Sequence, residues 1–334
     1  MIENMLSLAS RLVQTDIVSN PSKHLEDEAV AAGRKAEKQV EELLVNLGWM
    51  PSYNVFHSLR IPNGMQTGRR EIDLVVLTDD TIFCLEVKNW SGTISRCSDN
   101  VYWQQKVANH SRRDKGKFIQ HICPIRSIKE KTSLLRSHLS RGGIFIAESR
   151  FVFKVILVNV NGRVCERIAT SDAVVTHERL NAFATKFAKP YSAYLIDPLV
   201  PACFRGQFSY AQMEQIRAVL NLVGTWDVLE LHGGKVLHGD FKGCAEIKVE
   251  RKNVDTILFT HQRNKAAATF WAVLGYSPST TATLQKRGHY WWFGKETVGT
   301  VAVPFNRDVS FRVAGSAVDS RVPCNDINKV FLSC

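Results

Sequence analysis

The sequence predicts an α/β core followed by a β-rich domain, and three patterns indicate this. Apolar residues at helical spacing predict a helix over residues 26–47. Two β-branched runs, residues 71–78 and 81–88, are joined by Asp79-Asp80 and predict a β-hairpin. Beyond residue 209, short strand-like runs alternate with Gly and Asn, which is typical of a β-rich domain.

The segment after the hairpin extends the α/β pattern. We expect a helix over residues 118–139, despite Pro124, and another over residues 172–188. Residues 143–147 and 151–160 read as strands, and the second is apolar enough to be buried on both faces. Helices that alternate with strands in this way favour an α/β fold.

The proline-rich stretch 190–207 is the predicted linker. It separates an α/β domain, residues 20–190, from a β-rich domain of unknown role, residues 209–334. The second domain begins with an amphipathic helix over residues 209–223. Its short strands are expected at residues 228–231, 235–237, 256–260, 271–274, 290–293, 297–303 and 310–313.

Composition describes a folded, basic protein. Of the 334 residues, 45% are hydrophobic and 22% are charged, which excludes long disordered stretches. Lys and Arg outnumber Asp and Glu by 43 to 32 and give a net charge of +11. A basic surface attracts polyanions, so nucleic acid is the expected partner, and simple solubility is the alternative.

The cysteines and the N-terminal segment indicate the compartment. The eight cysteines are scattered without a Cys-x-x-Cys pair, so neither a structural zinc site nor a disulfide framework is expected. Glu3, Arg11 and Asp16 interrupt any signal-peptide core. No apolar run approaches the roughly 18 residues that span a bilayer. We therefore expect an intracellular protein, cytoplasmic or nuclear, with no membrane partner.

Three polar residues on the expected hairpin carry the chemistry. Glu86 and Lys88 lie two residues apart on one strand and so point to the same face, and Asp73 can lie beside them from the other strand. Two neighbouring carboxylates repel unless they share a cation, and Mg²⁺ prefers such oxygen ligands. The ammonium of Lys88 would then orient water or stabilise charge at a phosphate. A solvated surface ion pair is the alternative.

Short motifs around these residues resemble the nuclease-related domain family, NERD. They are Gly33-Arg-Lys-Ala-Glu37, Glu71-Ile-Asp73, Leu85-Glu-Val-Lys-Asn-Trp-Ser-Gly92 and Trp103-Gln104. The resemblance covers residues 31–139 and extends more loosely to about residue 188. The family belongs to the PD-(D/E)XK nuclease superfamily, so the resemblance implies a restriction-endonuclease-like core.

The resemblance also implies roles for individual residues. Asp73, Glu86 and Lys88 take the catalytic positions, and Asp73, Glu86 and Val87 are the expected ligands of Mg²⁺ or Mn²⁺. Glu37 matches the acid on the family's first helix and can complete the site. A solvated helix face is an equal alternative for Glu37, because Lys35, Lys38 and Glu41 surround it.

Two positions depart from the family pattern. Ala36 stands where Gly usually precedes the helix Glu, and only Pro124 remains of an Asn-Pro-x-x-Gln element. The second departure leaves the helix after Pro124 without its substrate-positioning motif, while the three polar residues of the hairpin are intact.

Basic and amide residues flank the expected site in the sequence. Arg69, Arg70, Gln104, Arg112 and Arg113 are the expected nucleic-acid contacts, with a solvated loop as the alternative for the arginines. Gln105 is a second candidate to approach the site. Trp90 and Trp103 are expected to pack internally rather than to stack on bases.

These expectations define a function and two alternatives. The main prediction is a metal-dependent endonuclease that hydrolyses DNA phosphodiester bonds. The first alternative is a catalytically inactive nucleic-acid-binding or interaction protein on a nuclease scaffold. The second is a C-terminal domain that binds a protein or small ligand and directs the nuclease. A Gly-x-x-x-x-Gly-Lys-Ser/Thr loop is missing from the sequence, which argues against ATP hydrolysis, and the oligomeric state stays open.

Overall fold

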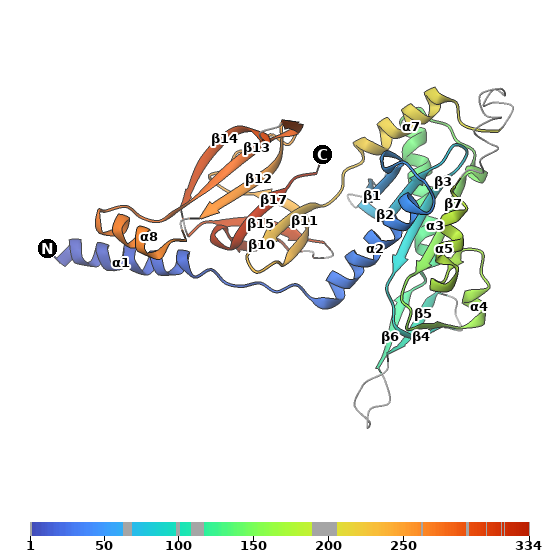
Figure 1. The fold of residues 1–334 in the computed structure, drawn as a ribbon, viewed down its shortest axis with the longest axis horizontal. Coiled ribbons are helices and arrows are strands. Elements are labelled where there is room, and N and C mark those ends of the chain that lie inside the picture. The colour runs from blue at the N-terminus through green and yellow to red at the C-terminus, as the bar shows by residue number, and fades with distance from the viewer. Residues whose placement is uncertain are drawn as a thin grey trace. The chain divides into compact units, whose positions relative to one another are not determined.

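The chain forms two compact units in the computed structural model (Figure 1). One unit is Glu28–Thr225, and the other combines Met1–Asp27 with Trp226–Cys334. The structure describes residues 2–62, 69–97, 101–107, 117–188, 206–261, 263–291, 294–304, 306–314, 316 and 318–333.

A mixed five-stranded sheet is the centre of the unit Glu28–Thr225. Its strands, in spatial order, are β1 (Val55–Pro62), β2 (Arg69–Leu77), β3 (Ile82–Lys88), β7 (Phe151–Leu157) and β9 (Val174–Val175). The expected hairpin is present as antiparallel β2 and β3, closed by the hydrogen bond from Thr78 N–H to the Thr81 carbonyl. Strands β3, β7 and β9 pair in parallel.

Helices bury both faces of this sheet. On one face, α2 (Glu28–Asn46) and α5 (His177–Thr185) pack against the side chains of Leu74, Leu85 and Val87. On the other face, α3 (Pro124–Arg141) and α7 (Tyr210–Leu222) form a separate core. Apolar side chains on both sides of the same strands explain why the hairpin sequence is almost continuously hydrophobic.

A second, smaller sheet extends from the end of the main one (Figure 1). Its strands, in spatial order, are β6 (Lys117–Ile122), β5 (Tyr102–Val107), β4 (Gly92–Arg96) and β8 (Gly162–Val164). Trp103 on β5 is fully buried and contacts Trp90 edge to face, with ring centroids 6.3 Å apart. Both tryptophans pack against the hydrophobic core as predicted, Trp103 fully buried and Trp90 partly buried at its edge.

The remaining regular elements of this unit are short. They are the helix α4 (Glu166–Ala169) and the 3₁₀ turns η1 (Ser52–Asn54) and η2 (Glu148–Arg150).

Some sequence expectations for this unit were wrong. Residues 118–122 are strand β6, and α3 begins at Pro124, because proline lacks the N–H that a helix interior needs and is favoured at the first helical position. Residues 143–147 form no strand. The helix expected over residues 172–188 divides into β9 and the shorter α5, and β7 is fully buried only over its last three residues.

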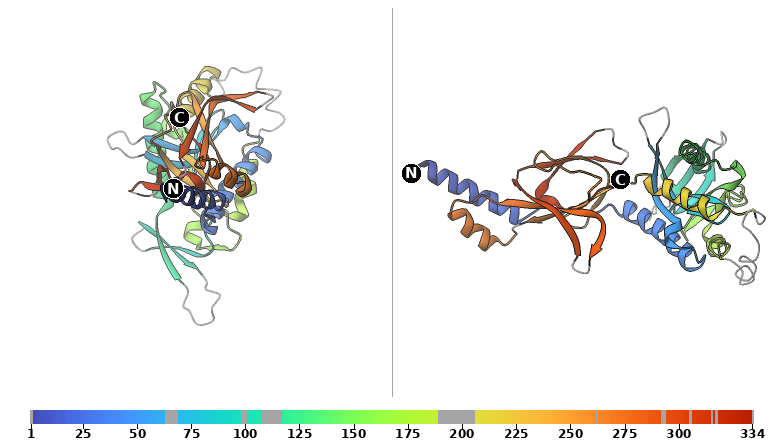
Figure 2. Two further views of the ribbon diagram at one scale, coloured as in Figure 1. Left: turned by 90° about the vertical axis from the view of Figure 1, so that its left-hand side faces the viewer. Right: turned by 90° about the horizontal axis from the view of Figure 1, so that it is seen from above.

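The second unit contains an antiparallel eight-stranded sheet (Figure 2). Its strands, in spatial order, are β14 (Gly294–Pro304), β13 (Ser279–Trp291), β12 (Val254–His261), β17 (Ile327–Phe331), β10 (Asp227–Leu231), β11 (Val236–Gly243), β15 (Asp308–Val313) and β16 (Ser320–Pro323). A third 3₁₀ turn, η3 (Cys324–Asp326), precedes β17. The expected β-rich character is confirmed, although the sequence analysis did not identify β16 or β17.

Two helices accompany this sheet. They are α1 (Ile2–Ser19) and α8 (Lys265–Val273), and Arg11 on α1 donates to the Ala272 carbonyl at 2.9 Å. The strand expected over residues 271–274 is wrong, because Asn264 caps α8 through the Ala267 N–H and the helix continues to Val273. In the part of the chain that is described, no helix is long and apolar enough to cross a membrane.

The boundary between the units lies later than the sequence predicted. Helix α7 belongs to the first unit, because Met213, Ile216 and Leu220 pack into the core that α3 shares. The first 27 residues belong to the β-rich unit. His24 fixes them there, since its backbone bonds with the second unit at the His232 carbonyl and the Lys235 N–H. Most of the expected linker, residues 190–205, lies outside the described residues.

Candidate active site

The first carboxylate of the site, Asp73, lies where β2 and β3 separate. The last pair in their register is Leu74 with Leu85, and one more step would place Asp73 opposite Glu86. Instead of continuing the ladder, Oδ2 of Asp73 accepts the backbone N–H of Val87 at 2.8 Å. This hydrogen bond holds the Asp73 carboxylate beside the backbone of Val87 on β3.

Lys88 lies between the two acids. Its Nζ is 2.8 Å from Oε1 of Glu86 and 4.0 Å from Oδ2 of Asp73. Glu86 and Lys88 are two residues apart on β3, so their side chains share the face that α3 covers. The spacing predicted this arrangement, and the three side chains lie together as expected.

A second lysine reaches the site from α3. Nζ of Lys131 is 2.6 Å from Oε2 of Glu86, so each carboxylate oxygen of Glu86 contacts an ammonium. The side chain of Lys131 is only 12% exposed. The sequence analysis did not identify this residue.

A signal for Lys131 was nevertheless present in the helix pattern. Ile128, Thr132 and Leu135 are buried on α3, and Lys131 falls on the same stripe at spacings of three and four residues. A lysine in an otherwise apolar stripe requires an acidic partner inside the fold.

Burial and neighbouring charges shift the ionisation of the acids in opposite directions. Burial, followed by the charge of Glu86, raises the pKa of Asp73 from 3.8 to about 7. Burial would also raise the pKa of Glu86, but Lys88 and Lys131 together hold it below its ordinary value. Burial opposes the charge on Lys88 as well, yet Glu86 and Asp73 keep the pKa of its ammonium above the usual value.

Glu37 faces the same group from α2. Burial, then the charges of Asp73 and Glu71, raises the pKa of its carboxyl group from 4.5 to about 7. The side chain is half-buried rather than part of a freely solvated helix face. Glu37 therefore lies near Asp73, as the resemblance to the family implied, and not on the solvated helix face that its charged neighbours in sequence suggested.

The donor set suits one divalent cation in chemistry and charge. Asp73 and Glu86 offer carboxylate oxygens, and in an extended strand the carbonyl of Val87 points to the same side as the N–H that Asp73 accepts. Burial and then neighbouring carboxylates raise the pKa values of Asp73 and Glu37, and a bound cation would favour their ionised forms. Within the described ranges, three side-chain donors from His, Cys, Asp or Glu do not converge, so a backbone oxygen or water would have to complete the shell.

The segment after β3 is held by a specific set of contacts. Asn89 donates to the Ala32 carbonyl on α2 and accepts from Asn159 at 2.8 Å. Gly92 has a φ of +81°, and a Cβ there would lie 2.2 Å from the Lys106 carbonyl oxygen, so only glycine fits. These contacts explain why the Asn-Trp-Ser-Gly run follows Lys88.

Gln105, rather than Gln104, lies against this segment. Gln105 is buried and donates to the Ser91 carbonyl at 2.8 Å, while its oxygen lies 2.9 Å from Nε2 of His121. Strand alternation places Gln104 on the opposite face of β5, half-buried. His121 stacks on Trp90 with ring centroids 4.1 Å apart, so a small polar and aromatic cluster lies next to the segment that follows β3.

The other expected nucleic-acid contacts are only partly placed. Arg69 and Arg70 are exposed at the start of β2, the strand that carries Asp73. Arg112 and Arg113 lie outside the described residues.

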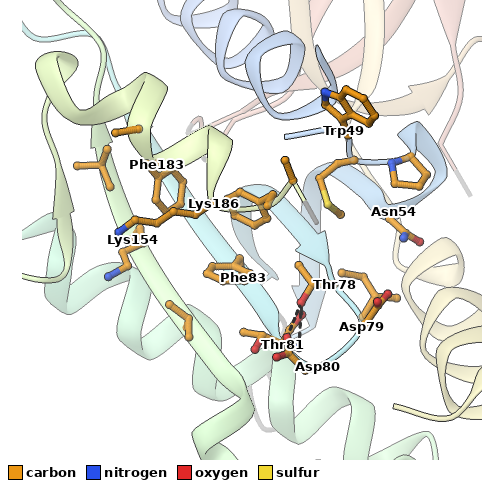
Figure 3. A pocket seen from close by; sticks show the side chains of 18 of the residues that line it. Trp49, Asn54, Thr78, Asp79, Asp80, Thr81, Phe83, Lys154, Phe183 and Lys186 are labelled. Carbon is orange, nitrogen blue, oxygen red and sulfur yellow. Dashed lines mark hydrogen bonds between the residues drawn. The ribbon is translucent and has the colours of Figure 1, made fainter. Parts of the chain in front are cut away.

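A cavity of this unit lies elsewhere (Figure 3). It has a volume of about 960 Å³ and is lined by the turn between β2 and β3, Phe83, and residues of α5 such as Phe183. Glu86 and Lys88 are at the other end of β3 and do not line it. The candidate active site therefore lies at the carboxyl end of β3 rather than in this cavity.

A mixed α/β fold with two acids and a lysine grouped at the end of a central strand is the arrangement that the sequence resemblance implied. In agreement, residues 32–159 match the family model of the nuclease-related domain. The unit Glu28–Thr225 thus contains a nuclease-related domain, and the assignment to the PD-(D/E)XK superfamily is consistent with that family. Neither a curated protein nor a solved structure matches the chain.

Proposed function

We propose that the unit Glu28–Thr225 is a Mg²⁺- or Mn²⁺-dependent nuclease that hydrolyses DNA phosphodiester bonds. The observation that carries the proposal is the position of the Lys88 ammonium between two buried carboxylates, 2.8 Å from Glu86 and 4.0 Å from Asp73. Asp73, Glu86 and the carbonyl of Val87 would hold the ion. Bound there, it would act as a Lewis acid on a phosphate oxygen and make a water molecule more acidic.

The chain's own residues divide the remaining tasks. Lys88 has an ammonium fixed by Glu86, so it can orient the attacking water and stabilise negative charge on the phosphate. Glu37 has a pKa of about 7, which suits a carboxylate that accepts a proton near neutral pH. The exposed Arg69 and Arg70 are positioned on β2 to contact neighbouring phosphates.

The test is cleavage of supercoiled plasmid DNA by the full chain in Mg²⁺ or Mn²⁺. We expect nicking by the wild type, loss of at least about 100-fold in Asp73→Ala and Lys88→Ala, and no cleavage in EDTA. Lys38→Ala is the matched control, because Lys38 is a 72% exposed lysine on α2. Equal cleavage by all four proteins would overturn the proposal and indicate a contaminating nuclease. A single-stranded RNA substrate run in parallel tests the choice of DNA.

A second candidate is a nucleic-acid-binding protein that uses this scaffold without turnover. It is favoured by one observation: both oxygens of Glu86 already contact ammoniums, so the acid is compensated without a metal. This candidate predicts DNA binding that weakens steeply with salt and yields no products in any divalent ion. Metal-dependent products that disappear in Asp73→Ala would exclude it.

A further inference from the structure

Lys131 has a contact that the proposed reaction does not use. We propose that Lys131 is a built-in counter-ion of Glu86 that makes binding of the divalent ion depend on the presence of a DNA phosphodiester. The inference rests on the proposed function, because it assumes that Asp73 and Glu86 are the ligands of the ion.

The contacts place Lys131 where it competes with a cation. Its Nζ lies 2.6 Å from Oε2 of Glu86, and Lys88 occupies Oε1 at 2.8 Å. The side chains of Glu86 and Lys131 are 7% and 12% exposed, so water screens this pair poorly. An ion that binds Glu86 must therefore share it with Lys131 or displace the ammonium.

Charge balance supplies the dependence on DNA. The side chains in direct contact are Asp73, Glu86, Lys88 and Lys131, and their charges balance when both acids are ionised. A divalent ion bound to the two carboxylates would leave these four side chains with two excess positive charges, and one phosphodiester would offset one of them. Each ligand then improves the site for the other, and the coupling is reciprocal by linkage. Without Lys131, the ion would leave only one excess positive charge.

The alternative is that Lys131 only ties α3 to β3. Helix α3 covers the face of the sheet to which Glu86 on β3 points, and the ion pair joins the two elements. A purely structural tie would affect the free energy of unfolding and leave the affinity for metal unchanged. The affinity for a divalent metal ion therefore distinguishes the two roles without an assay of catalysis.

The experiment measures Mn²⁺ binding to the full chain by electron paramagnetic resonance, without DNA. We expect Lys131→Met to bind Mn²⁺ at least about tenfold more tightly than the wild type, because a nearby positive charge has been removed. Lys131→Arg retains the charge and should resemble the wild type. Lys129→Met is the matched control, since Lys129 is an exposed lysine on the same helix. Lys131→Gln serves if the Met variant does not fold.

A second measurement tests the coupling to DNA. The affinity for a fluorescent 20-base-pair duplex is measured by anisotropy with and without Mn²⁺, and gels check that the duplex stays intact. We expect Mn²⁺ to tighten DNA binding strongly in the wild type and in Lys129→Met, and several-fold less in Lys131→Met.

The outcomes separate this inference from the proposed function. Unchanged Mn²⁺ affinity in a folded Lys131→Met protein would overturn the counter-ion role and leave the proposed nuclease standing. If Asp73→Ala, added to Lys131→Met, does not weaken Mn²⁺ binding, or if no variant binds Mn²⁺, the metal site itself is overturned, and the inference with it.

Discussion

The backbone N–H of Val87 and Oδ2 of Asp73 form a 2.8 Å hydrogen bond where β2 and β3 separate. Because the pairing of β2 with β3 ends at Leu74 and Leu85, the N–H of Val87 has no backbone acceptor on β2, and the Asp73 carboxylate takes that place. It also ties the position of Asp73 to the strand that carries Glu86 and Lys88. Asp73 therefore has a structural role as well as the proposed metal-binding one.

Two substitutions separate those roles. Asp73→Asn keeps an acceptor for Val87 but removes the buried charge, whereas Asp73→Ala removes both. We expect both variants to lose metal-dependent cleavage, and Asp73→Ala to be less stable than Asp73→Asn by about 1–3 kcal/mol, because an unpaired buried N–H is costly. Urea unfolding of the full chain at pH 8 in EDTA measures the difference. Equal stability of the two variants would contradict a structural role for the bond.

The raised pKa values predict how stability depends on pH without metal. Asp73 and Glu37 have pKa values of about 7 in the folded chain, against ordinary values of 3.8 and 4.5. Between about pH 4 and pH 7 the unfolded chain loses these two protons and the folded chain retains them. The contribution of both groups is thus fully present in acid and is lost as the pH rises through 7. Glu86 has a lowered pKa in the folded chain, so its contribution to stability is instead lost as the pH falls in the acid range.

The measurement is urea unfolding in EDTA between pH 5 and pH 8. We expect Asp73→Asn to gain stability relative to the wild type as the pH rises over this range, because it lacks the titrating carboxyl group. Added Mg²⁺ should stabilise the wild type more at pH 8 than at pH 5. A difference between wild type and Asp73→Asn that stays constant with pH would show that Asp73 titrates normally.

The cluster beside β3 gives a third prediction. The amide N–H of Gln105 donates to the Ser91 carbonyl, so its oxygen faces His121 and requires the Nε2–H tautomer. Burial and then the charge of Lys88 lower the pKa of His121 below 6.5, so the ring is neutral at pH 7. We expect Lys88→Met to raise that pKa by removing a nearby positive charge.

Nitrogen-15 NMR of labelled histidines reports both the tautomer and the titration. Lys106→Met is the control, since Lys106 is an exposed lysine on β5. A His121 that titrates identically in Lys88→Met would show that the ring does not sense the charge of Lys88.

The hairpin and its three polar residues were predictable because both depend on local pattern. Alternation fixes which face each strand residue takes, and the two-residue acidic turn brings the strands together. Lys131 was harder to find, because its contact with Glu86 joins residues 45 positions apart and depends on where α3 begins. The sequence analysis placed the start of the helix at residue 118, although Pro124 is a local signal for the first helical position.

The predicted boundary between the domains differs from the observed one for a related reason. Helix α7 follows a proline-rich stretch, which reads as a linker, yet its apolar stripe of Met213, Ile216 and Leu220 fills the first core. An amphipathic helix shows which side is apolar but not which core it meets. Likewise, nothing local in residues 20–27 indicates that His24 bonds with His232, more than 200 residues later.

Asp227 on β10 is a buried acid that joins several segments of the β-rich unit. Its carboxylate is 2% exposed and receives two parallel hydrogen bonds of 2.8 Å from Arg251. It also accepts the N–H of Phe241 at 2.7 Å and that of Ser333 at 2.8 Å. One side chain thereby joins β10, β11, the segment before β12 and the end of the chain.

Asp227→Ala should destabilise this unit by about 2–5 kcal/mol, because it leaves the N–H groups of Phe241 and Ser333 without their acceptor and removes both carboxylate bonds to Arg251. Asp319→Ala is the matched control. It removes an exposed pair with Arg312 and should cost less than about 1 kcal/mol. Urea unfolding of the full chain at pH 7 measures both. Arg251→Lys should fall between them, since lysine retains the charge but cannot make both parallel bonds. Equal stability of Asp227→Ala and Asp319→Ala would mean that the network does not stabilise the sheet.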